Sequence, residues 1–364
     1  MKILLHGAIN GTNFGDCLFA TLFYKRLTDA FGKENVWFYD KKPFGIGQHL
    51  RETLSYDKHL SSKEMQKVNA LVYISGGYFG DGSKSIKQSM IRYYRYFTLG
   101  CRSVTHNQSI AVVGLEVGPL HHGFVKKAAK KILAHASFLT VRNEESKSYL
   151  EEMGITHSRC TVDTAVSLKD EDFLADVSDS MKQFVSSCEG KILFLHMLPS
   201  DKPNERFLKT VLEPVTKFVL EHPEYCVVYG TDGGKREMDD TWIKQKLESQ
   251  GVKSYYALYR NCMDMCYLLN NASVVVTRKL HVGIVAATLG KSVISTPLHQ
   301  YKTARFYKQI GQENRCVSYD KLDKDTVYSL LQTYASQPIS ISQDIRSLAQ
   351  TNLDSLVEFL KEER

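Results

Sequence analysis

The stretch from residue 273 to residue 297 constrains the fold of this chain more than any other stretch. Residues 273–276 end in three valines and predict a buried strand. After a polar turn, the apolar residues 282–289 predict a helix, and residues 292–295 predict a second strand. This order is a βαβ unit, so the chain is expected to build an open parallel sheet covered by helices.

The polar turn between the first strand and the helix carries Arg278, Lys279 and His281. Open parallel sheets bind ligands at the carboxyl ends of their strands. A helix N-terminus also favours an anion. The turn therefore predicts an anion-binding site. The alternative is that Arg278 and Lys279 are solvated and that His281 caps the helix.

The alternation of strand, loop and helix recurs in both halves of the chain. Predicted strands lie at residues 3–6, 36–39, 70–74, 110–113, 138–141, 192–196, 226–229 and 255–258. We therefore predict an α/β protein with two doubly wound Rossmann-like domains facing across a cleft, as in GT-B glycosyltransferases. The predicted parts are an N-terminal domain (1–170), a polar linker (171–190), a C-terminal domain (191–338) and a closing amphipathic helix (339–364).

Glycine-rich loops follow the first and third predicted strands. In the first loop, Asn13, Gly15 and Asp16 are candidates to hydrogen-bond sugar hydroxyls, although Asp16 is equally suited to cap the following helix. In the second, Gly76 and Gly77 allow a ligand to approach the backbone closely, or simply form a tight turn.

Two charged residues stand after later strands of the first half. Glu116 lies in the predicted loop 114–119 and is a candidate carboxylate at the same sheet edge. Arg142 lies at the junction between the strand 138–141 and a helix. A guanidinium at such a junction is suited to clamp a carboxylate or phosphate through two hydrogen bonds.

The net charge and the cysteine pattern indicate what kind of ligand and which cellular compartment to expect. The formal charge of +7 comes from scattered cations, which suits a small acidic substrate better than nucleic acid. The eight cysteines match no common zinc or disulfide spacing, so we expect reduced thiols and no metal site. No apolar run approaches the length of a membrane span, and the protein is expected in the cytoplasm.

A basic stripe runs along the predicted helix 123–135. Lys126, Lys127, Lys130 and Lys131 recur on this helix. The favoured interpretation is a solvated face. The alternative is peripheral contact with anionic lipid headgroups on the inner face of the membrane.

Taken in order, these motifs resemble the polysaccharide pyruvyl transferase family. The matching pieces are Asn13 to Asp16, Gly76 and Gly77, Gly118 and Pro119, Val141, Arg142 and Ser146, Asp163, the turn ending at His281, and Lys302. Each motif is weak alone, and the ordered set covers most of the chain. The family usually has Arg-Leu-His where this chain has Lys279, Leu280 and His281, with Arg278 one position earlier.

The resemblance implies transfer of the enolpyruvyl group of phosphoenolpyruvate (PEP) to a sugar diol of a polysaccharide or its precursor. The products would be a cyclic pyruvate ketal and phosphate, with PEP as co-substrate and no other cofactor. It implies a PEP site with His281, Arg142 and Lys302 in catalytic roles. Arg278, Lys279 and Leu280 would adjoin the donor. Asn13, Gly15, Asp16, Gly76, Gly77 and Glu116 would face the acceptor sugar, which is lipid-linked in one version of this hypothesis.

Two other functions remain open at this point. A GT-B glycosyltransferase that uses a nucleotide sugar would share the fold and also place cations beside a leaving phosphate. A non-catalytic binding protein would keep the fold without turnover. The cations and the imidazole near the predicted strand ends favour an enzyme.

Overall fold

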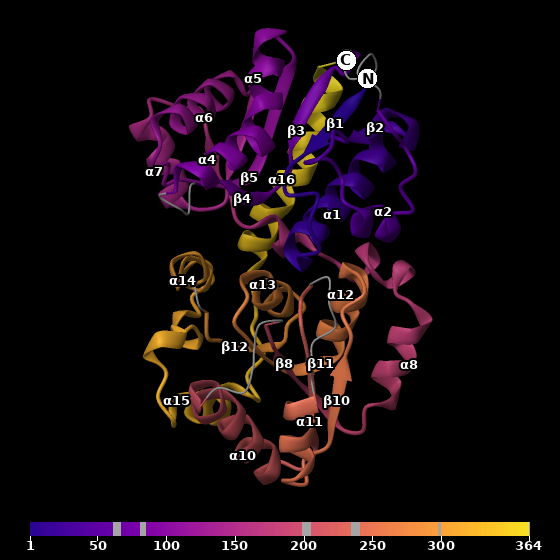
Figure 1. The fold of residues 1–364 in the computed structure, drawn as a ribbon, viewed down its shortest axis with the longest axis vertical. Helices are drawn as coiled ribbons and strands as arrows, with labels where there is room; N and C mark the ends of the chain where they lie inside the picture. The colour runs from indigo at the N-terminus through magenta and orange to yellow at the C-terminus, as the bar shows by residue number, and fades with distance from the viewer. Residues whose placement is uncertain (61–66, 81–84, 199–204, 234–240, 298–299, 364) are drawn as a thin grey trace. The chain divides into compact units, whose positions relative to one another are not determined.

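The computed structural model describes the chain except for residues 61–66, 81–84, 199–204, 234–240, 298–299 and 364. The chain forms two compact units (Figure 1). Unit 1 comprises residues 1–12, 16–167 and 344–364, and unit 2 comprises residues 13–15 and 168–343. We predicted a domain boundary at residue 170; in the structure the chain leaves unit 1 after Ser167 and returns to it at Asp344.

The described strands of unit 1 form one parallel sheet. Their order is β2-β1-β3-β5-β6-β7, and β4 pairs with β5. Their bounds are Ile3–His6 (β1), Val36–Phe38 (β2), Ala70–Tyr73 (β3), Gly76–Phe79 (β4), Ser109–Val117 (β5), Phe138–Val141 (β6) and Arg159–Cys160 (β7). The order reverses direction between β1 and β3, which is where doubly wound sheets bind ligands.

Helices connect these strands. Their bounds are Phe14–Phe31 (α1), Gln48–Thr53 (α2), Ile86–Arg92 (α4), Thr98–Thr105 (α5), Gly123–His135 (α6), Glu144–Glu152 (α7) and Gln343–Glu362 (α16), with a π-helical turn at Tyr93–Phe97 (η2) between α4 and α5. α7 begins where the Asn143 side chain accepts a hydrogen bond from the Ser146 amide, the expected N-cap.

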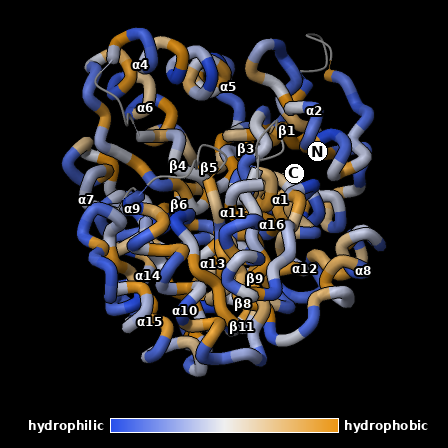
Figure 2. The backbone as a smooth tube through the Cα atoms, turned by 60° about the horizontal axis from the view of Figure 1, so that its bottom comes forward, coloured by the Kyte–Doolittle hydropathy of each residue, from blue (hydrophilic) through white to orange (hydrophobic). Residues whose placement is uncertain are grey.

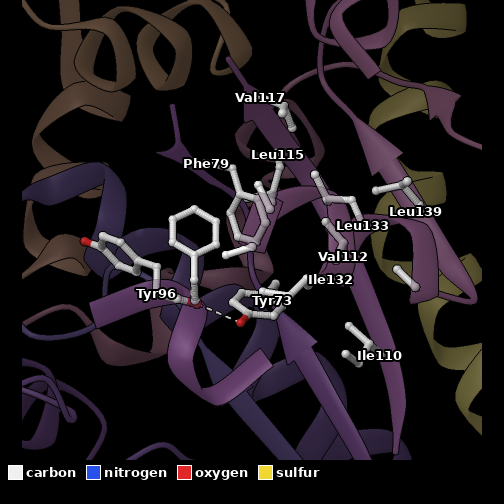
Figure 3. Close-up of a cluster of buried hydrophobic side chains, with 14 of the residues drawn as sticks. Tyr73, Phe79, Tyr96, Ile110, Val112, Leu115, Val117, Ile132, Leu133 and Leu139 are labelled. Carbon is white, nitrogen blue, oxygen red and sulfur yellow. Dashed lines mark hydrogen bonds between the residues drawn. The ribbon is translucent and has the colours of Figure 1, made fainter. Parts of the chain in front are cut away.

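The core of unit 1 lies between its sheet and the helices that cover it. Figure 3 shows Tyr73 of β3 beside Phe79 of β4, with Ile132 of α6 in the same cluster. The buried Tyr73 hydroxyl donates a hydrogen bond to the Tyr96 carbonyl at 2.7 Å. A Cβ at Gly100 would lie 2.3 Å from that hydroxyl, so glycine allows α5 to approach the sheet.

The C-terminal helix α16 belongs to unit 1, and one buried amide fixes it there. Asn352 is fully buried. Its Oδ1 accepts hydrogen bonds from the Thr140 hydroxyl (2.9 Å) and the Thr161 hydroxyl (3.0 Å). Its Nδ2 donates to the Val162 carbonyl at 3.0 Å. The helix predicted at the end of the chain therefore completes the first domain through specific polar contacts as well as through its apolar face.

Unit 2 contains the second parallel sheet, in the order β10-β9-β8-β11-β12. The strands are Lys191–His196 (β8), Tyr225–Gly230 (β9), Ser254–Ala257 (β10), Ala272–Thr277 (β11) and Ser292–Ser295 (β12). The order reverses between β8 and β11, the strand predicted at residues 273–276. The prediction of a doubly wound α/β protein is confirmed for both sheets.

The described helices of unit 2 are Asp179–Ser187 (α8), Glu205–Phe207 (α9), Glu213–Glu221 (α10), Thr241–Glu248 (α11), Cys262–Asn271 (α12), Leu280–Thr288 (α13), Gln300–Gln309 (α14) and Thr326–Tyr334 (α15). A π-helical turn, Leu208–Leu212 (η6), joins α9 to α10. Figure 2 shows that α13 and β8 are largely hydrophobic, as expected of elements buried in the centre of a unit. Among the described helices, none is both long and apolar enough to cross a membrane.

Several local predictions differ from the structure. Residues 76–79 and 114–117, expected as loops, are strand β4 and the end of β5, because each pairs with its neighbour despite its glycines. Residues 48–53, in the stretch between β2 and β3, form α2, which buries Leu50.

The stretch predicted as a polar linker, residues 171–190, is folded. The Ser178 hydroxyl caps α8 and also donates to the Asp264 carboxylate of α12 at 2.9 Å. Phe173 and Met181 are buried. The mostly polar composition of this stretch predicted a linker, but its few buried apolar side chains pack it onto unit 2.

Candidate active site

The carboxyl end of the unit 1 sheet holds a buried group of three charges. Arg142 is the first residue after β6, and Glu116 lies near the end of β5. The Arg142 guanidinium pairs with the Glu116 carboxylate and, at 2.7 Å, with Asp163. The three side chains are between 2% and 6% exposed. Their formal charges sum to one negative charge, so this arrangement by itself does not attract an anion.

Surrounding hydrogen bonds hold the carboxylates and strand ends in place. Asp163 also accepts a hydrogen bond from the Ala165 amide at 3.0 Å. The Ser146 hydroxyl accepts one from the Val117 amide at 3.0 Å, which ties the first turn of α7 to β5. Burial would lower the pKa of Arg142, but the two carboxylates outweigh it and raise that pKa. The guanidinium is therefore charged at every physiological pH.

Gly76, Gly77 and Asp16, predicted to contact the acceptor, lie elsewhere in the unit 1 fold. Gly76 and Gly77 begin β4, beside the point where the strand order reverses. Asp16 is half-buried in the first turn of α1 and is not its cap. After burial itself, the Asp16 carboxylate is among the groups that raise the pKa of Tyr96. Asp16 is thus near enough to Tyr96 to act on it electrostatically.

The carboxyl end of the unit 2 sheet carries the predicted anion-binding turn. Arg278 and Lys279 directly follow β11, and His281 lies in the first turn of α13. This is the strand at which the sheet order reverses, so the turn occupies the topological switch point of unit 2. Lys302, from α14, is exposed.

The two neighbouring cations of the turn have different environments. Arg278 is 8% exposed, and its guanidinium carbon lies 5.2 Å from the Phe207 ring centroid and 5.1 Å from that of Tyr319. These distances are those of cation–π contacts on two rings. The Lys279 side chain is 37% exposed, with its ammonium 3.7 Å from the Asp232 carboxylate. Lys279 is therefore the more accessible of the two cations.

Asp232 and His196 are site residues that the sequence analysis did not single out. His196 ends β8, and Asp232 follows β9. The His196 ring nitrogen Nε2 lies 3.2 Å from the Asp232 carboxylate. Burial would raise the pKa of Asp232, but His196 and Lys279 outweigh it and lower that pKa. Both residues lie at the carboxyl ends of strands beside the switch point. This position in the sequence, directly after a predicted strand, is the feature that could have identified them as site residues.

The segment Asn13–Gly15 is grouped with unit 2 and adjoins this turn. The Phe14 amide donates a hydrogen bond to the Asp232 carbonyl at 2.9 Å. A Cβ at Gly15 would lie 1.9 Å from Nδ1 of His281, so only glycine allows this approach. The structure thus brings Gly15 and His281 together, although the sequence analysis assigned them to acceptor and donor respectively.

Two further features that could take part in chemistry are a metal-binding cluster and the buried His6. In the described part of the chain, no three His, Cys, Asp or Glu side chains gather in a way that suits a metal ion. His6, at the end of β1, is fully buried, and burial lowers its pKa to about 4. It packs edge-on against the Tyr39 ring at 4.9 Å and belongs to the core.

Solved structures with a similar fold include UDP-GlcNAc 2-epimerases and a glycosyltransferase. UDP-GlcNAc 2-epimerase from Methanocaldococcus jannaschii aligns over 99% of both chains with a TM-score of 0.64 and 12% identity. The Neisseria meningitidis UDP-GlcNAc 2-epimerase aligns over 98% of this chain and 100% of its own, with a TM-score of 0.63 and 11% identity. A glycosyltransferase from Rickettsia africae gives a TM-score of 0.52 at 12% identity, covering 100% and 98%. These likenesses show a GT-B-like fold and nothing more.

Comparison with sequence families is more specific. No curated protein sequence matched the chain. The sequence model of the polysaccharide pyruvyl transferase family matches residues 13–299, which begin at Asn13 and include Arg142 and His281. The match spans well over half of the chain, and the resemblance of the ordered motifs is confirmed: the protein belongs to the polysaccharide pyruvyl transferase family.

Proposed function

We propose that the protein transfers the enolpyruvyl group of PEP to two hydroxyls of a sugar in a polysaccharide or its precursor. The observation that carries the proposal is the turn after β11, where Lys279 and His281 stand at the switch point within the family match. PEP serves as co-substrate, and no further cofactor is required by this chemistry. The reaction would take place in the cytoplasm.

Binding of PEP requires cations for both its carboxylate and its phosphate. We assign Lys279 to the donor, because its ammonium is partly exposed while Arg278 is covered by two rings. The N-terminus of α13 adds a favourable dipole for an anion. Lys302 is exposed and supplies a second charge. Arg142 remains a proposed PEP contact, although Glu116 and Asp163 already pair with its guanidinium.

The reaction balances in protons and bonds. The PEP methylene gains a proton and becomes a methyl group, which leaves its neighbouring carbon electron-poor. One sugar hydroxyl adds to that carbon, and the second hydroxyl displaces phosphate as the bond between that carbon and the phosphate oxygen breaks. Of the two hydroxyl protons released, one replaces the proton given to the methylene and the other leaves with the phosphate. His281 is the proposed proton carrier, because an imidazole changes charge near neutral pH. Its step is either methylene protonation or phosphate departure.

The acceptor hydroxyls require a base and hydrogen-bonding groups. Asn13, Gly15, Gly76 and Gly77 remain the proposed backbone and amide contacts. Glu116 already neutralises Arg142. Asp16 is half-buried, and we favour it as the carboxylate that meets a hydroxyl.

The direct test is incubation with PEP and a panel of pyranosides. We expect release of phosphate together with a mass gain by the sugar. His281→Ala and Lys279→Ala should lose turnover while keeping the melting temperature, and Lys308→Ala, on the last turn of α14, serves as the matched control. Full activity in both site variants would remove the turn from the mechanism.

A nucleotide-sugar transferase is the second candidate, favoured by the fold of the structural neighbours. Thermal shift distinguishes the two, since a ligand that binds the native state raises the melting temperature. Stabilisation by PEP and not by UDP-sugars supports pyruvyl transfer. The reverse result supports the second candidate.

A further inference from the structure

An unusual set of apolar side chains is exposed on α4 and η2 of unit 1. Ile86 is 62% exposed, Met90 46%, Ile91 44% and Tyr94 54%. Spacings of four and eight residues from Ile86 place Met90 and Tyr94 on the same side of this helical run. Ser89, Tyr96 and Phe97 face the interior of the unit instead.

The start of α6 extends this exposed surface. Phe124 is 39% exposed, and its ring lies 5.8 Å from that of Tyr93 in an edge-on contact. Tyr93 in turn contacts Tyr94 at 5.7 Å. Ring contacts therefore join the two helices. We call Ile86, Met90, Ile91, Tyr94 and Phe124 the apolar patch. Contiguous apolar surface of this kind on a folded protein marks an interaction site.

The charge around the apolar patch is almost entirely positive. Residues 85–135 contain eight lysines and arginines: Lys87, Arg92, Arg95, Arg102, Lys126, Lys127, Lys130 and Lys131. Glu116 is the only acidic residue in the same stretch, and it is buried against Arg142. Acidic side chains resume in α7, beside which Lys126 lies over the Tyr149 ring at 5.8 Å. Arg92 and Arg95 are half-buried: Arg92 donates a hydrogen bond to the Tyr78 carbonyl, and Arg95 lies over the Phe44 ring. The exposed cations of α4 and α6 are Lys87 and the four lysines of α6, and they attract an anionic partner.

We propose that this surface docks on an anionic lipid bilayer. The apolar patch would enter the boundary between headgroups and acyl chains, where aromatic rings are also favoured. Lys127 and Lys130 would lie against the phosphates of the headgroups. A nucleic acid or an acidic polysaccharide would satisfy the lysines but leave Ile86 and Ile91 without an apolar environment. The proposal does not depend on pyruvyl transfer, because docking requires no donor.

Vesicle flotation of the full chain tests the proposal. We expect binding to phosphatidylcholine vesicles that contain phosphatidylglycerol, and weak or no binding to phosphatidylcholine alone. Each of Lys127→Ala and Lys130→Ala should weaken the partition coefficient roughly five-fold, and added salt should reduce that difference. Ile91→Glu combined with Met90→Glu should abolish flotation.

Leu220→Glu is the matched control, since Leu220 is 52% exposed on α10 of unit 2. The control should float like the unchanged protein, and all variants should keep its melting temperature. Binding that ignores phosphatidylglycerol, or that survives the double glutamate variant, would overturn the proposal. So would binding to soluble dextran sulfate without binding to vesicles, which would identify a polyanion site.

Discussion

The two carboxylates paired with Arg142 decide whether its guanidinium can bind a ligand. A guanidinium at a strand end suggested an open clamp for the donor. In the structure it lies buried between Glu116 and Asp163. A buried charge that loses a partner is costly, so these carboxylates stabilise the fold whatever else they do.

We predict that Asp163→Asn lowers the free energy of unfolding by about 1–3 kcal/mol, because the buried Arg142 guanidinium loses one of its two charged partners. Urea unfolding measures the change. Asp29→Asn, on the exposed side of α1 in the same unit, should change stability by less than about 0.5 kcal/mol. Equal stability of the Asp163 variant and the unchanged protein would show that Glu116 alone suffices.

Lys279 and Arg278 offer a contrast between adjacent cations. We predict that Lys279→Ala removes the thermal stabilisation given by PEP but leaves the melting temperature without ligand nearly unchanged. Arg278→Ala should lower that melting temperature, since contacts with two rings contribute about 1–2 kcal/mol together. Thermal melts with and without PEP measure both effects. The assignment fails if the two variants exchange these behaviours.

Asp232 should give a pH-dependent contribution to stability. Its pKa in the folded protein is below its ordinary value of 3.8. Its contribution is thus fully present above that value and is lost as the pH falls through the folded pKa. Asp232→Asn should lower the free energy of unfolding by about 1–3 kcal/mol near pH 7, and by less near pH 3. Urea unfolding at both pH values checks this, with exposed Asp179→Asn of α8 as control. A deficit that is the same at both pH values would contradict the sign.

At the scale of elements, the strongest sequence patterns predicted the structure well. The β-branched run before Arg278 is β11, and the small apolar residues after His281 are α13. These patterns succeed because an element buried on all sides needs an unbroken apolar sequence. An apolar pattern does not predict a glycine-rich strand such as β4, because pairing with β5 decides the conformation of β4.

The sequence predicted which residues lie at the sheet edges of the candidate site, but not how they are paired. Position after a strand identified Arg142 and Lys279 as residues of the two sheet edges. It did not reveal that Arg142 is already ion-paired, or that Asp232 and His196 accompany Lys279. Such pairings join residues that are distant in sequence, so no local pattern encodes them.

The docking of α16 depends on Asn352. We predict that Asn352→Leu destabilises the protein by about 2–4 kcal/mol, because the Thr140 and Thr161 hydroxyls and the Val162 carbonyl lose their buried partner. Urea unfolding measures this. Thr351→Ala, an exposed neighbour on the same helix, should have little effect. A neutral Asn352→Leu would mean that the apolar face alone fixes the helix.

At the scale of the whole molecule, the two units have different chain topologies. Unit 2 is nearly continuous, whereas unit 1 takes its last helix from the other end of the chain. We predict that residues 168–343 melt cooperatively as an isolated fragment. Residues 1–167 should melt cooperatively only when α16 is supplied, for example by fusing residues 343–364 through a flexible linker. Calorimetry of the three fragments checks this, and a cooperative melt of residues 1–167 alone would refute it.

The return of α16 to the first sheet also has a consequence for biosynthesis. A ribosome that makes this protein completes the sequence of unit 2 before it has made the helix that unit 1 lacks. Until α16 emerges, the Thr140 and Thr161 hydroxyls lack Asn352 as their hydrogen-bond partner, and the side chains that bury Leu356 and Leu360 lack these contacts. Unit 1 therefore begins to leave the tunnel before unit 2 and is completed after it, so during translation it exposes apolar surface for longer than unit 2 does.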